Sequence, residues 1–283
     1  MAGTVIDGKK IAGYHEERLK DNISRMDRPP ALHTILVGQD EGSRVYVGVK
    51  ERGCKRVGIR TRTHLFHEDI SREELQECIN KLNGDDSVDG ILLQMPLPEH
   101  LDAPELILGL DVGKDVEGMH PHNLGALVSG KEDVVPCTPG GIITMLEHIG
   151  CELKGKEVCV VSHSPVVGKP LALMLLNRNA TATVIHEHTG DIREHTKRAD
   201  VLITAAGVPG LIRGDMIKEG AVVVDVGMNR LKSGELVGDV VFNEAMERAG
   251  YITPVPGGVG PMTVYTLLRN TYELSVVNQK KYK

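Results

Sequence analysis

The sequence has little of what a nucleic-acid-binding protein or a membrane protein needs. Its 283 residues include no tryptophan, two phenylalanines and six tyrosines, so few rings are present on which single-stranded bases could stack. The 33 lysines and arginines are outnumbered by 39 aspartates and glutamates, which gives a formal net charge of −6, whereas nucleic acids and anionic membranes usually bind a basic face. We therefore expect neither nucleic acid nor a membrane as a partner.

Long apolar runs and paired cysteines are missing as well. The apolar run at residues 221–224 stops at Asp225, far short of the roughly 18 residues that a membrane-spanning helix needs. The first residues contain no apolar signal-peptide core. The five cysteines are an odd number and form no CxxC pair, which favours reduced thiols over a disulfide framework. These features predict a cytoplasmic protein.

The residues that are present are typical of a globular α/β enzyme. Hydrophobic residues make up 41% of the chain and charged residues 25%, which argues against disorder, collagen and coiled coil. Predicted strands and helices alternate in the first half: strands at residues 32–37, 62–66 and 90–95, and helices at residues 42–57 and 71–82. The second helix opens with a capping box, Ser71 to Glu74. Strands separated by helices of this length pair in parallel.

The second half predicts another α/β series. A helix that begins at Thr138-Pro139 and ends at Gly150 links it to the first half. Further strands are predicted at residues 157–161, 183–186, 201–204 and 221–225, and a proline- and glycine-rich loop at 253–261 precedes a final helix. We predict two α/β domains with an interdomain cleft, where ligands often bind. The first domain comprises residues 1–138, with the final helix (261–283) packing back on it, and the second comprises residues 139–260.

The loop at residues 161–170 joins a strand to a helix, as the phosphate-binding loop of a Rossmann-like dinucleotide domain does. Backbone N–H groups at such a helix N-terminus receive the pyrophosphate. Ser162 and Ser164 replace the first glycines of the usual GxGxxG pattern, but Gly168 is present and Glu187 closes the next strand. The loop therefore predicts a nicotinamide-dinucleotide site, with a structural turn that binds no ligand as the alternative.

Two other kinds of site compete for these segments. A P-loop for ATP needs glycine at position 163 and serine or threonine at position 170, where the chain has histidine and proline. The pairs His120/His122 and His186/His188 have the chemistry of metal ligands, but neither has a Cys, Asp or third His at a recognised spacing. We predict neither an ATP site nor a metal site.

Four residues in the first half have the chemistry of a catalytic site. Tyr46 and Lys50 lie four residues apart on the predicted helix, hence on one face, and a lysine beside a ring can transfer protons when it is partly desolvated. For these two residues alone, a solvated helix face is the favoured interpretation. Short-chain dehydrogenases share the YxxxK spacing, but their nucleotide loop precedes it, whereas here the loop follows. Gln94 ends a strand, where α/β sites usually lie, and the Asp115 carboxylate could accept paired N–H bonds from an aminopyrimidine.

Five ordered segments carry a family resemblance. They are Val37-Gly-Gln-Asp40 with Ser43, Tyr46 and Lys50; residues 89–98 (DGILLQMPLP); residues 114–118 (KDVEG); residues 136–139 (PCTP); and residues 254–263 (PVPGGVGPMT). Together they resemble the bifunctional methylenetetrahydrofolate dehydrogenase/methenyltetrahydrofolate cyclohydrolase family nearly from end to end. The alternatives are another two-domain dehydrogenase, such as one resembling shikimate dehydrogenase, and a folate- or nucleotide-binding protein without turnover.

The resemblance implies a two-domain subunit, usually in a homodimer, that binds a folate and NADP or NAD. It implies that Lys50 is the central catalytic residue, that Tyr46 packs on the folate, that Gln94 positions Lys50 and that Asp115 holds the pterin. The folate site would be bordered by Pro256, Gly257 and Gly258. The residues expected near the nucleotide are Ser162, His163, Ser164, Gly168, Glu187 and Met228.

The implied chemistry has two steps. Hydride leaves the methylene bridge of 5,10-methylenetetrahydrofolate for the nicotinamide ring, which gives the 5,10-methenyl cation. Water then adds to this cation, and proton transfers that involve Lys50 open it to 10-formyltetrahydrofolate. One site can serve both steps because the cation formed first is the electrophile that is hydrated next.

One departure from the family pattern concerns the choice of nucleotide. Many members have glycine-arginine-serine where this chain has Ser162-His163-Ser164, and serine where it has Glu187. An arginine–serine pair suits the 2′-phosphate of NADP, whereas a carboxylate suits a ribose 2′-hydroxyl and repels phosphate. We therefore expect NAD to be used at least comparably with NADP.

Overall fold

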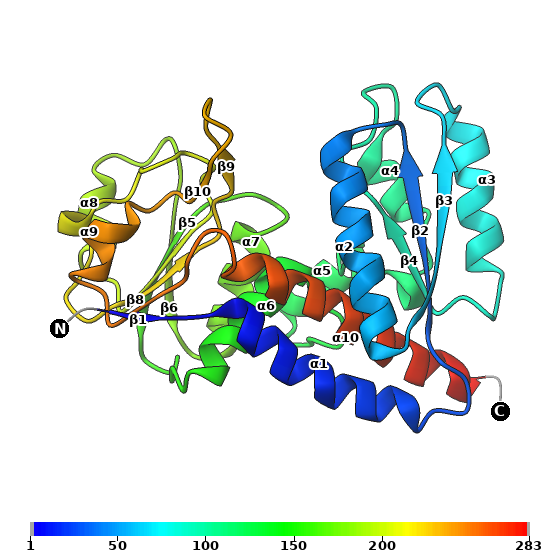
Figure 1. The fold of residues 1–283 in the computed structure, drawn as a ribbon, viewed down its shortest axis with the longest axis horizontal. Helices are drawn as coiled ribbons and strands as arrows, with labels where there is room; N and C mark the ends of the chain where they lie inside the picture. Colours follow the sequence, from blue (N-terminus) through cyan, green and yellow to red (C-terminus); the bar gives the residue numbers. More distant parts are fainter. Residues whose placement is uncertain (1–2, 282–283) are drawn as a thin grey trace. The chain divides into compact units, whose positions relative to one another are not determined.

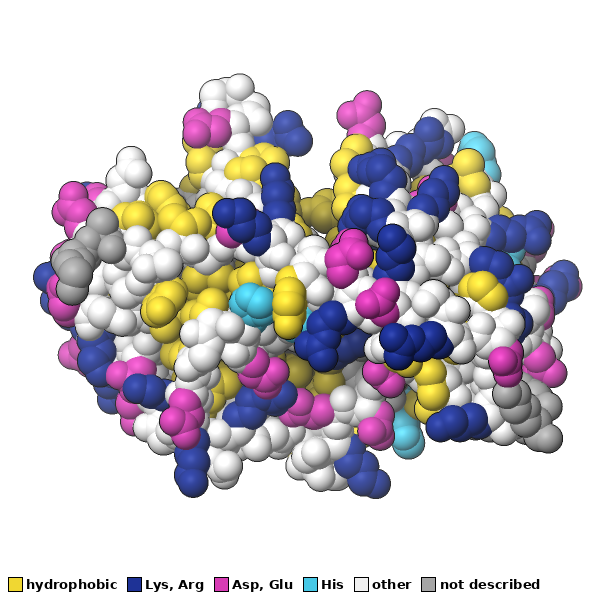
Figure 2. Space-filling model, turned by 60° about the horizontal axis from the view of Figure 1, so that its bottom comes forward, with side chains coloured by type: hydrophobic (Ala, Val, Ile, Leu, Met, Phe, Trp, Pro, Cys, Tyr) yellow, Lys and Arg dark blue, Asp and Glu magenta, His cyan; other side chains and the backbone are white. Residues whose placement is uncertain are grey.

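The computed structural model describes residues 3–281 and consists of two compact units (Figure 1). Unit 1 comprises Met1–Gly13 and Pro136–Thr263, and unit 2 comprises Tyr14–Val135 and Val264–Lys283. Each unit therefore contains two separate stretches of the chain. No helix within residues 3–281 is long and apolar enough to cross a membrane. On the surface shown in Figure 2, acidic and basic side chains are mixed.

Unit 2 is built on a parallel sheet of three strands in the order β3-β2-β4. The strands are β2 (Ala31–Val37), β3 (Arg60–Phe66) and β4 (Gly90–Leu93). Figure 1 shows β2 between β3 and β4, and Ile35 pairs with His64 on one side and with Leu93 on the other. One core cluster joins apolar residues of β2 and β4 to α3 (Arg72–Asn83) and α4 (Ala103–Leu108). The predicted parallel pairing of these strands is confirmed.

Local sequence signals set the ends of the helices in unit 2. In α2 (Glu41–Val57), the Asp40 side chain accepts a hydrogen bond from the Ser43 N–H at 2.6 Å, and this bond lowers the pKa of Asp40. The helix ends at Gly58, whose φ of 89° is left-handed and favours glycine. The capping box predicted for Ser71 and Glu74 is present at the start of α3.

Most of α1 (Gly8–Ser24) also belongs to unit 2, which begins at Tyr14. The other helical segments of the unit follow β4. They are η1 (Val112–Lys114), α5 (Pro121–Val128) and the end of α10 (Val259–Lys281). Asn270 of α10 is buried and donates hydrogen bonds to the carbonyl oxygens of Val116 at 2.9 Å and Val135 at 2.8 Å. These bonds satisfy two backbone acceptors and tie α10 to the first stretch of the unit.

Unit 1 contains a parallel sheet of six strands in the order β1-β11-β8-β7-β5-β6. The strands are β1 (Thr4–Val5), β5 (Glu157–Val161), β6 (Thr181–Ile185), β7 (Val201–Thr204), β8 (Val222–Asp225) and β11 (Tyr251–Ile252). The helices are α6 (Cys137–His148), α7 (Gly168–Asn177), α8 (Ile192–Thr196), α9 (Phe242–Met246) and η2 (Gly214–Met216). An antiparallel hairpin of β9 (Asn229–Arg230) and β10 (Leu236–Val237) follows β8. The predicted Rossmann-like sheet is confirmed.

The order of these strands creates a topological switch point beside β5. The chain continues from β5 to β6 on one side of β5, and then to β7 on the other side. The loops after β5 and β7 therefore diverge at the carboxyl edge of the sheet. In open α/β sheets, this divergence creates the crevice in which ligands bind.

The structure corrects the predicted start of the first domain. We expected residues 1–138 to form one block, but Met1–Gly13 belongs to unit 1. The reason is the strand β1, in which Thr4 pairs with Tyr251 and Val5 with Ile252. Shortly after it, a side chain at Gly8 would lie 1.8 Å from the carbonyl oxygen of Gly258, so this contact requires glycine.

Candidate catalytic site and nucleotide site

Lys50 of α2 lies at the centre of a small polar cluster in unit 2. Its Nζ donates a hydrogen bond to Gln94 Oε1 at 3.1 Å and forms an ion pair with Glu117 Oε1 at 3.2 Å. The Lys50 side chain is 12% exposed and that of Glu117 is 29% exposed, so the cluster is mostly removed from water. The structure thus brings together two of the predicted catalytic residues, Lys50 and Gln94.

Gln94 owes its orientation to the end of β4. Its backbone N–H continues the sheet by donating to the Ile35 carbonyl at 3.0 Å, and its side-chain amide donates to the Met95 carbonyl at 2.6 Å. The amide nitrogen is thereby occupied, which leaves the oxygen directed at Lys50. Gln94 is 7% exposed, so its geometry is fixed by the protein and not by solvent.

Glu117 is a member of the cluster that the sequence analysis did not single out. It lies in the KDVEG segment, two residues after Asp115, and Asp115 forms a parallel bridge with Ile91 of β4. This bridge places the segment beside β4, the strand that Gln94 directly follows. Membership in the same motif was the signal available in the sequence, but the ion pair itself depends on tertiary packing.

Asp115 is buried by its own neighbours. The exposed fraction of the residue is 1%, and its Oδ2 accepts hydrogen bonds from the His120 N–H at 2.7 Å and from Asn123 Nδ2 at 2.9 Å. Both bonds come from the start of α5 and reach the same oxygen. The carboxylate therefore anchors this helix, and its predicted role toward a pterin stays a prediction.

Tyr46 and the Pro256-Gly257-Gly258 loop complete the predicted folate set. Tyr46 lies one turn before Lys50 on α2 and is 43% exposed, so its ring is accessible to a ligand. The loop belongs to unit 1. Its Gly257 has φ of 110°, and a side chain at Gly258 would lie 2.7 Å from the Pro254 carbonyl oxygen. These two positions therefore require glycine for backbone reasons alone.

A hollow of about 430 Å³ lies at the carboxyl ends of β5, β6 and β7 in unit 1. The residues that line it include Val161, Ser162, His163, Ser164, His186, Glu187, Ala205, Ala206 and Val208. Four of the six residues predicted to contact the nucleotide are among them, while Gly168 and Met228 are outside the lining. The position fits the usual ligand crevice of such a sheet.

The first turn of α7 shows how a dinucleotide loop can work without the usual glycines. Ser164 Oγ accepts hydrogen bonds from the N–H groups of Val167 at 3.1 Å and Gly168 at 3.4 Å. The serine hydroxyl therefore holds the turn that leads into the helix, whose N-cap residue is Val167. A side chain at Gly168 would lie 2.0 Å from the Ser162 carbonyl oxygen, so this glycine is required where helix and strand approach each other most closely.

Three imidazoles surround Glu187 at the rim of this hollow. His163 Nδ1 lies 3.5 Å from Glu187 Oε2, and His188 Nε2 lies 3.7 Å from Glu187 Oε1, while the rings of His163 and His186 are 4.7 Å apart. A hydrogen bond from its own backbone N–H lowers the pKa of Glu187, and the three histidines lower it further. Glu187 is thus held as an anion, 64% exposed.

The same cluster has the composition of a metal site, but one hydrogen bond works against that use. Ligand atoms of His163, His186 and Glu187 lie within 4.8 Å of one another. The Nδ1 atom of His186, however, accepts the His188 backbone N–H at 3.2 Å, so the neutral ring carries its proton on Nε2. An Nε2–H group can donate to a phosphate or hydroxyl oxygen but cannot coordinate a metal.

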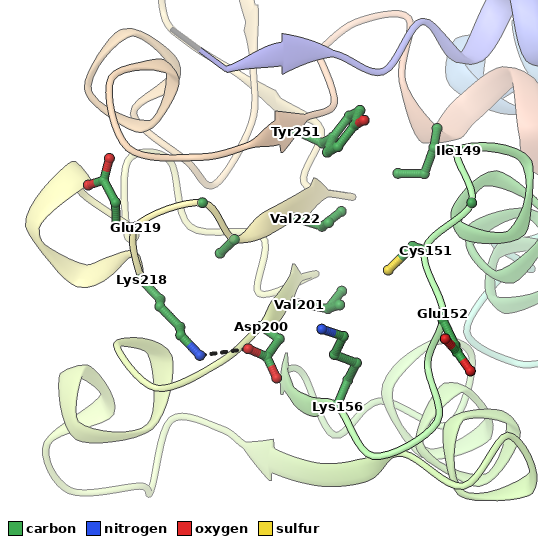
Figure 3. Close-up of a pocket in the computed structure, with 13 residues that line it drawn as sticks. Ile149, Cys151, Glu152, Lys156, Asp200, Val201, Lys218, Glu219, Val222 and Tyr251 are labelled. Atoms are coloured by element: carbon green, nitrogen blue, oxygen red, sulfur yellow. Dashed lines mark hydrogen bonds and ion pairs between the residues drawn. The ribbon is translucent and has the colours of Figure 1, made fainter. Parts of the chain in front are cut away.

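A second hollow of unit 1, about 400 Å³ in volume, lies at the opposite ends of the strands (Figure 3). Val201, Val222 and Tyr251, the first residues of β7, β8 and β11, line it. At its rim Lys218 Nζ pairs with Asp200 Oδ1 at 2.6 Å. Ligands of open α/β sheets bind at the carboxyl ends of the strands, so the hollow beside Glu187 is the stronger nucleotide candidate.

Comparison with known families agrees with this division of the chain. The model of the tetrahydrofolate dehydrogenase/cyclohydrolase catalytic domain matches residues 6–117, and that of the NAD(P)-binding domain of the same family matches residues 136–279. The resemblance that the five sequence segments carry is therefore confirmed.

Individual relatives match over almost the whole chain. The bifunctional protein FolD of Aquifex aeolicus is 50% identical over 272 residues, covering 94% of this chain and 93% of its own. The crystal structure of the bifunctional enzyme FolD from Campylobacter jejuni is 44% identical, with a TM-score of 0.95 and coverage of 98% and 99%. The Trypanosoma brucei enzyme, solved with NADP cofactor and inhibitor, is 34% identical, with a TM-score of 0.94 and coverage of 100% and 99%. The chain belongs to the tetrahydrofolate dehydrogenase/cyclohydrolase family.

Proposed function

We propose that this protein is a bifunctional enzyme that oxidises 5,10-methylenetetrahydrofolate to the 5,10-methenyl cation and hydrolyses the cation to 10-formyltetrahydrofolate. The observation that carries the proposal is the mostly buried Lys50–Gln94–Glu117 cluster, found within the catalytic domain of a chain from this family. The full-length match to bifunctional relatives supports both activities.

The hydrolysis needs a group that can take up and release protons at the one-carbon bridge. Water adds to the bridge carbon of the cation and loses one proton. The bond from this carbon to one ring nitrogen then breaks, that nitrogen gains a proton, and the hydroxyl loses its remaining proton as its oxygen becomes the formyl carbonyl. We assign these transfers to Lys50 Nζ, which Gln94 Oε1 and Glu117 Oε1 hold in place at 3.1 and 3.2 Å. Tyr46, exposed one turn away, offers a ring for the folate to pack on.

The dehydrogenase step needs a hydride acceptor, which the nicotinamide ring of NAD(P) supplies when it is bound. The hollow at the carboxyl ends of β5, β6 and β7 has the position for the nucleotide, and Gly168 permits the close approach of strand and helix that such a site needs. We place the adenosine ribose near Glu187 and His163. Hydride transfer requires contact between the nicotinamide ring and the methylene bridge, and the family resemblance implies that Pro256, Gly257 and Gly258 border the folate.

The proposal extends to assembly and location. We propose a homodimer, as the family resemblance implies, acting in the cytoplasm. The five cysteines, none of them in a disulfide in the structure, agree with a reducing compartment. Light scattering of the purified protein measures the first point, and a mass of one subunit at working concentration would contradict it.

One spectroscopic experiment tests the central proposal. The protein is mixed with 5,10-methylenetetrahydrofolate and either NADP⁺ or NAD⁺, and the absorbance of the reduced nucleotide and of methenyltetrahydrofolate is followed together. A bifunctional enzyme produces reduced nucleotide while the methenyl signal rises and then decays. A protein that binds both ligands without any absorbance change would instead be a binding protein, and reduction of nucleotide without decay of the methenyl signal would leave a dehydrogenase alone.

The nucleotide preference gives a separate prediction. We expect the unmodified enzyme to use NAD⁺ at least comparably with NADP⁺, because the Glu187 carboxylate accepts a ribose 2′-hydroxyl but repels a 2′-phosphate. Glu187→Ser is expected to shift the ratio of kcat/KM values toward NADP⁺ by about tenfold. The comparison is made with both nucleotides at the same ionic strength, because the repulsion is screened by salt.

Glu194→Ser is the matched control for this prediction. Glu194 is an exposed carboxylate on α8 that does not line the hollow, so its loss changes the net charge equally without changing the site. Strong NADP⁺ preference in the unmodified enzyme, unaltered by Glu187→Ser, would show that Glu187 does not face the ribose.

A further inference from the structure

Asp239, which follows β10, is a fully buried carboxylate that collects an unusual number of hydrogen bonds. Its exposed fraction is 0%. Its Oδ2 accepts from Thr204 Oγ1 at 3.0 Å and from the N–H groups of Ala206 at 2.7 Å and Gly207 at 3.2 Å, and its Oδ1 accepts from the Val208 N–H at 3.0 Å and Asn229 Nδ2 at 2.9 Å. A buried carboxylate is costly unless several donors satisfy it, and here five do.

Three of these donors are successive backbone amides of the loop after β7. Gly207 has φ of 69°, and this left-handed turn directs the amides of residues 206–208 at one point, as in an anion-binding nest. The occupant of the nest is a side chain of the protein itself. Ala205, Ala206 and Val208 of the same loop line the hollow assigned to the nucleotide. Asp239 thus fixes one wall of that hollow from behind.

A second carboxylate fixes Asp239 in turn. Asp225, the last residue of β8, accepts the backbone N–H groups of Gly227 and Asp239 at 3.0 Å and that of Val240 at 2.9 Å. A side chain at Gly238 would lie 1.8 Å from Asp225 Oδ2, and one at Gly227 would lie 2.2 Å from Asp239 Oδ1. Both glycines are therefore needed to pack the two carboxylates this closely.

The arrangement connects the carboxyl ends of two adjacent strands. Thr204 ends β7, and Asn229 follows β8 as the start of β9. An apolar residue at position 239 would leave the amides of residues 206–208 without this partner. The carboxylate therefore fixes the conformation of the loop of residues 205–208, which lines the candidate nucleotide site.

We propose that Asp239 is a positioning residue for the nucleotide: it holds the loop of residues 205–208 in the conformation that the dinucleotide binds, without touching the dinucleotide itself. This inference rests on the proposed function only in assigning the hollow beside Glu187 to NAD(P). Loss of the Asp239 carboxylate should affect the two activities differently, because hydrolysis of methenyltetrahydrofolate consumes no nucleotide. Loss of the anchor affects nucleotide binding and leaves that activity in place.

The test measures the two functions separately in Asp239→Asn. The amide keeps the size of the carboxylate but has one acceptor oxygen in place of two. We expect the Kd values of NADP⁺ and NAD⁺ to rise at least about tenfold. Hydrolysis of added methenyltetrahydrofolate, assayed without nucleotide, is expected to stay within about twofold of that of the unmodified enzyme. Unchanged Kd values, or an equal loss of both functions, would overturn the assignment.

A second variant near Asp239 and a control variant complete this test. Thr204→Val removes one donor to Asp239 at nearly constant volume and is expected to raise the nucleotide Kd about two- to tenfold in a protein that folds normally. If Asp239→Asn does not fold, an unchanged nucleotide Kd in Thr204→Val would contradict the inference. Asp200→Asn is the matched control. The Asp200 carboxylate accepts hydrogen bonds from Lys218 Nζ and from the Glu157 N–H, but it lies in unit 1 at the second hollow, away from the candidate nucleotide site. The nucleotide Kd of this control variant is expected to stay unchanged. An unmodified enzyme that does not bind NAD(P) would instead refute the proposed function.

Discussion

Replacing Lys50 by methionine is expected to lower the rate of methenyltetrahydrofolate hydrolysis at least about 100-fold, the usual contribution of a positioned acid–base group. Methionine keeps the unbranched apolar stem but has no atom that carries or relays a proton. Gln94 Oε1 then loses its 3.1 Å partner, while Glu117, 29% exposed, can turn to water. The rate is followed from the decay of the methenyl absorbance.

Nucleotide binding provides the internal control for this variant, because the candidate nucleotide hollow belongs to unit 1. The Kd of NADP⁺ should therefore match that of the unmodified protein. Lys55→Met is the matched substitution: Lys55 is exposed on the same helix, so its loss costs a charge but no site contact. Near-normal hydrolysis by folded Lys50→Met would remove Lys50 from the mechanism.

Asp115→Asn is expected to weaken folate binding about 10- to 100-fold while nucleotide binding changes little. Both intramolecular hydrogen bonds of Asp115 reach Oδ2, so an asparagine oxygen placed there preserves the anchor of α5. The amide nitrogen then takes the place of Oδ1 and can no longer accept from the pterin, and a hydrogen bond to a charged group is worth about 1.5–3 kcal/mol. Titration calorimetry with a folate and with NADP⁺ measures the two affinities.

This substitution separates two interpretations of a residue that is 1% exposed. If Asp115 only anchors α5, Asp115→Asn leaves the folate Kd unchanged, and the pterin must be held elsewhere. Asp111→Asn is the control, because Asp111 accepts the Gly113 N–H at 2.7 Å at the start of η1 and asparagine caps equally well. A similar loss of folate affinity in both variants would point to disturbance of the whole segment.

Much of the fold was predictable because its signals are local or periodic. The Ser71–Glu74 capping box, Gly58 after α2 and the buried apolar strands of unit 1 each act within a few residues. Strands separated by helices then dictate parallel sheets with little freedom left. The contact between Gln94 and Lys50 was predictable for a similar reason. Gln94 follows directly after β4, and ligand sites of α/β sheets lie at the carboxyl ends of the strands.

The features that escaped prediction depend on contacts between distant residues. β1 has only Thr4 and Val5, too few to show a strand pattern, and it exists because β11 offers an edge to pair with. The ion pair of Glu117 with Lys50 and the five bonds to Asp239 join residues whose spacing in the sequence has no regularity. In the sequence alone, these carboxylates cannot be told apart from solvent-exposed ones, because most acidic residues are exposed. Only the fold brings hydrogen-bond donors to them.

The loop before α7 shows a different limit. The sequence predicts that amides at this helix start face a pyrophosphate, and the structure adds that Ser164 Oγ accepts hydrogen bonds from the N–H groups of Val167 and Gly168. The Ser164 hydroxyl thus holds the turn at a position where the GxGxxG pattern has glycine. Pattern matching records this as a missing glycine and cannot show what the substituted hydroxyl does.

The discontinuous composition of both units also determines when each can be completed during synthesis. β1 pairs with β11, so the start of unit 1 has no partner until the ribosome has released Tyr251 and Ile252. Unit 2 in turn waits for Asn270, whose two bonds reach Val116 and Val135. Until then the nascent chain carries unpaired strand edges and exposed apolar faces, which are the features that invite aggregation and chaperone binding. A fragment of residues 136–263 made alone would keep that defect permanently, since β11 would lack its neighbour β1.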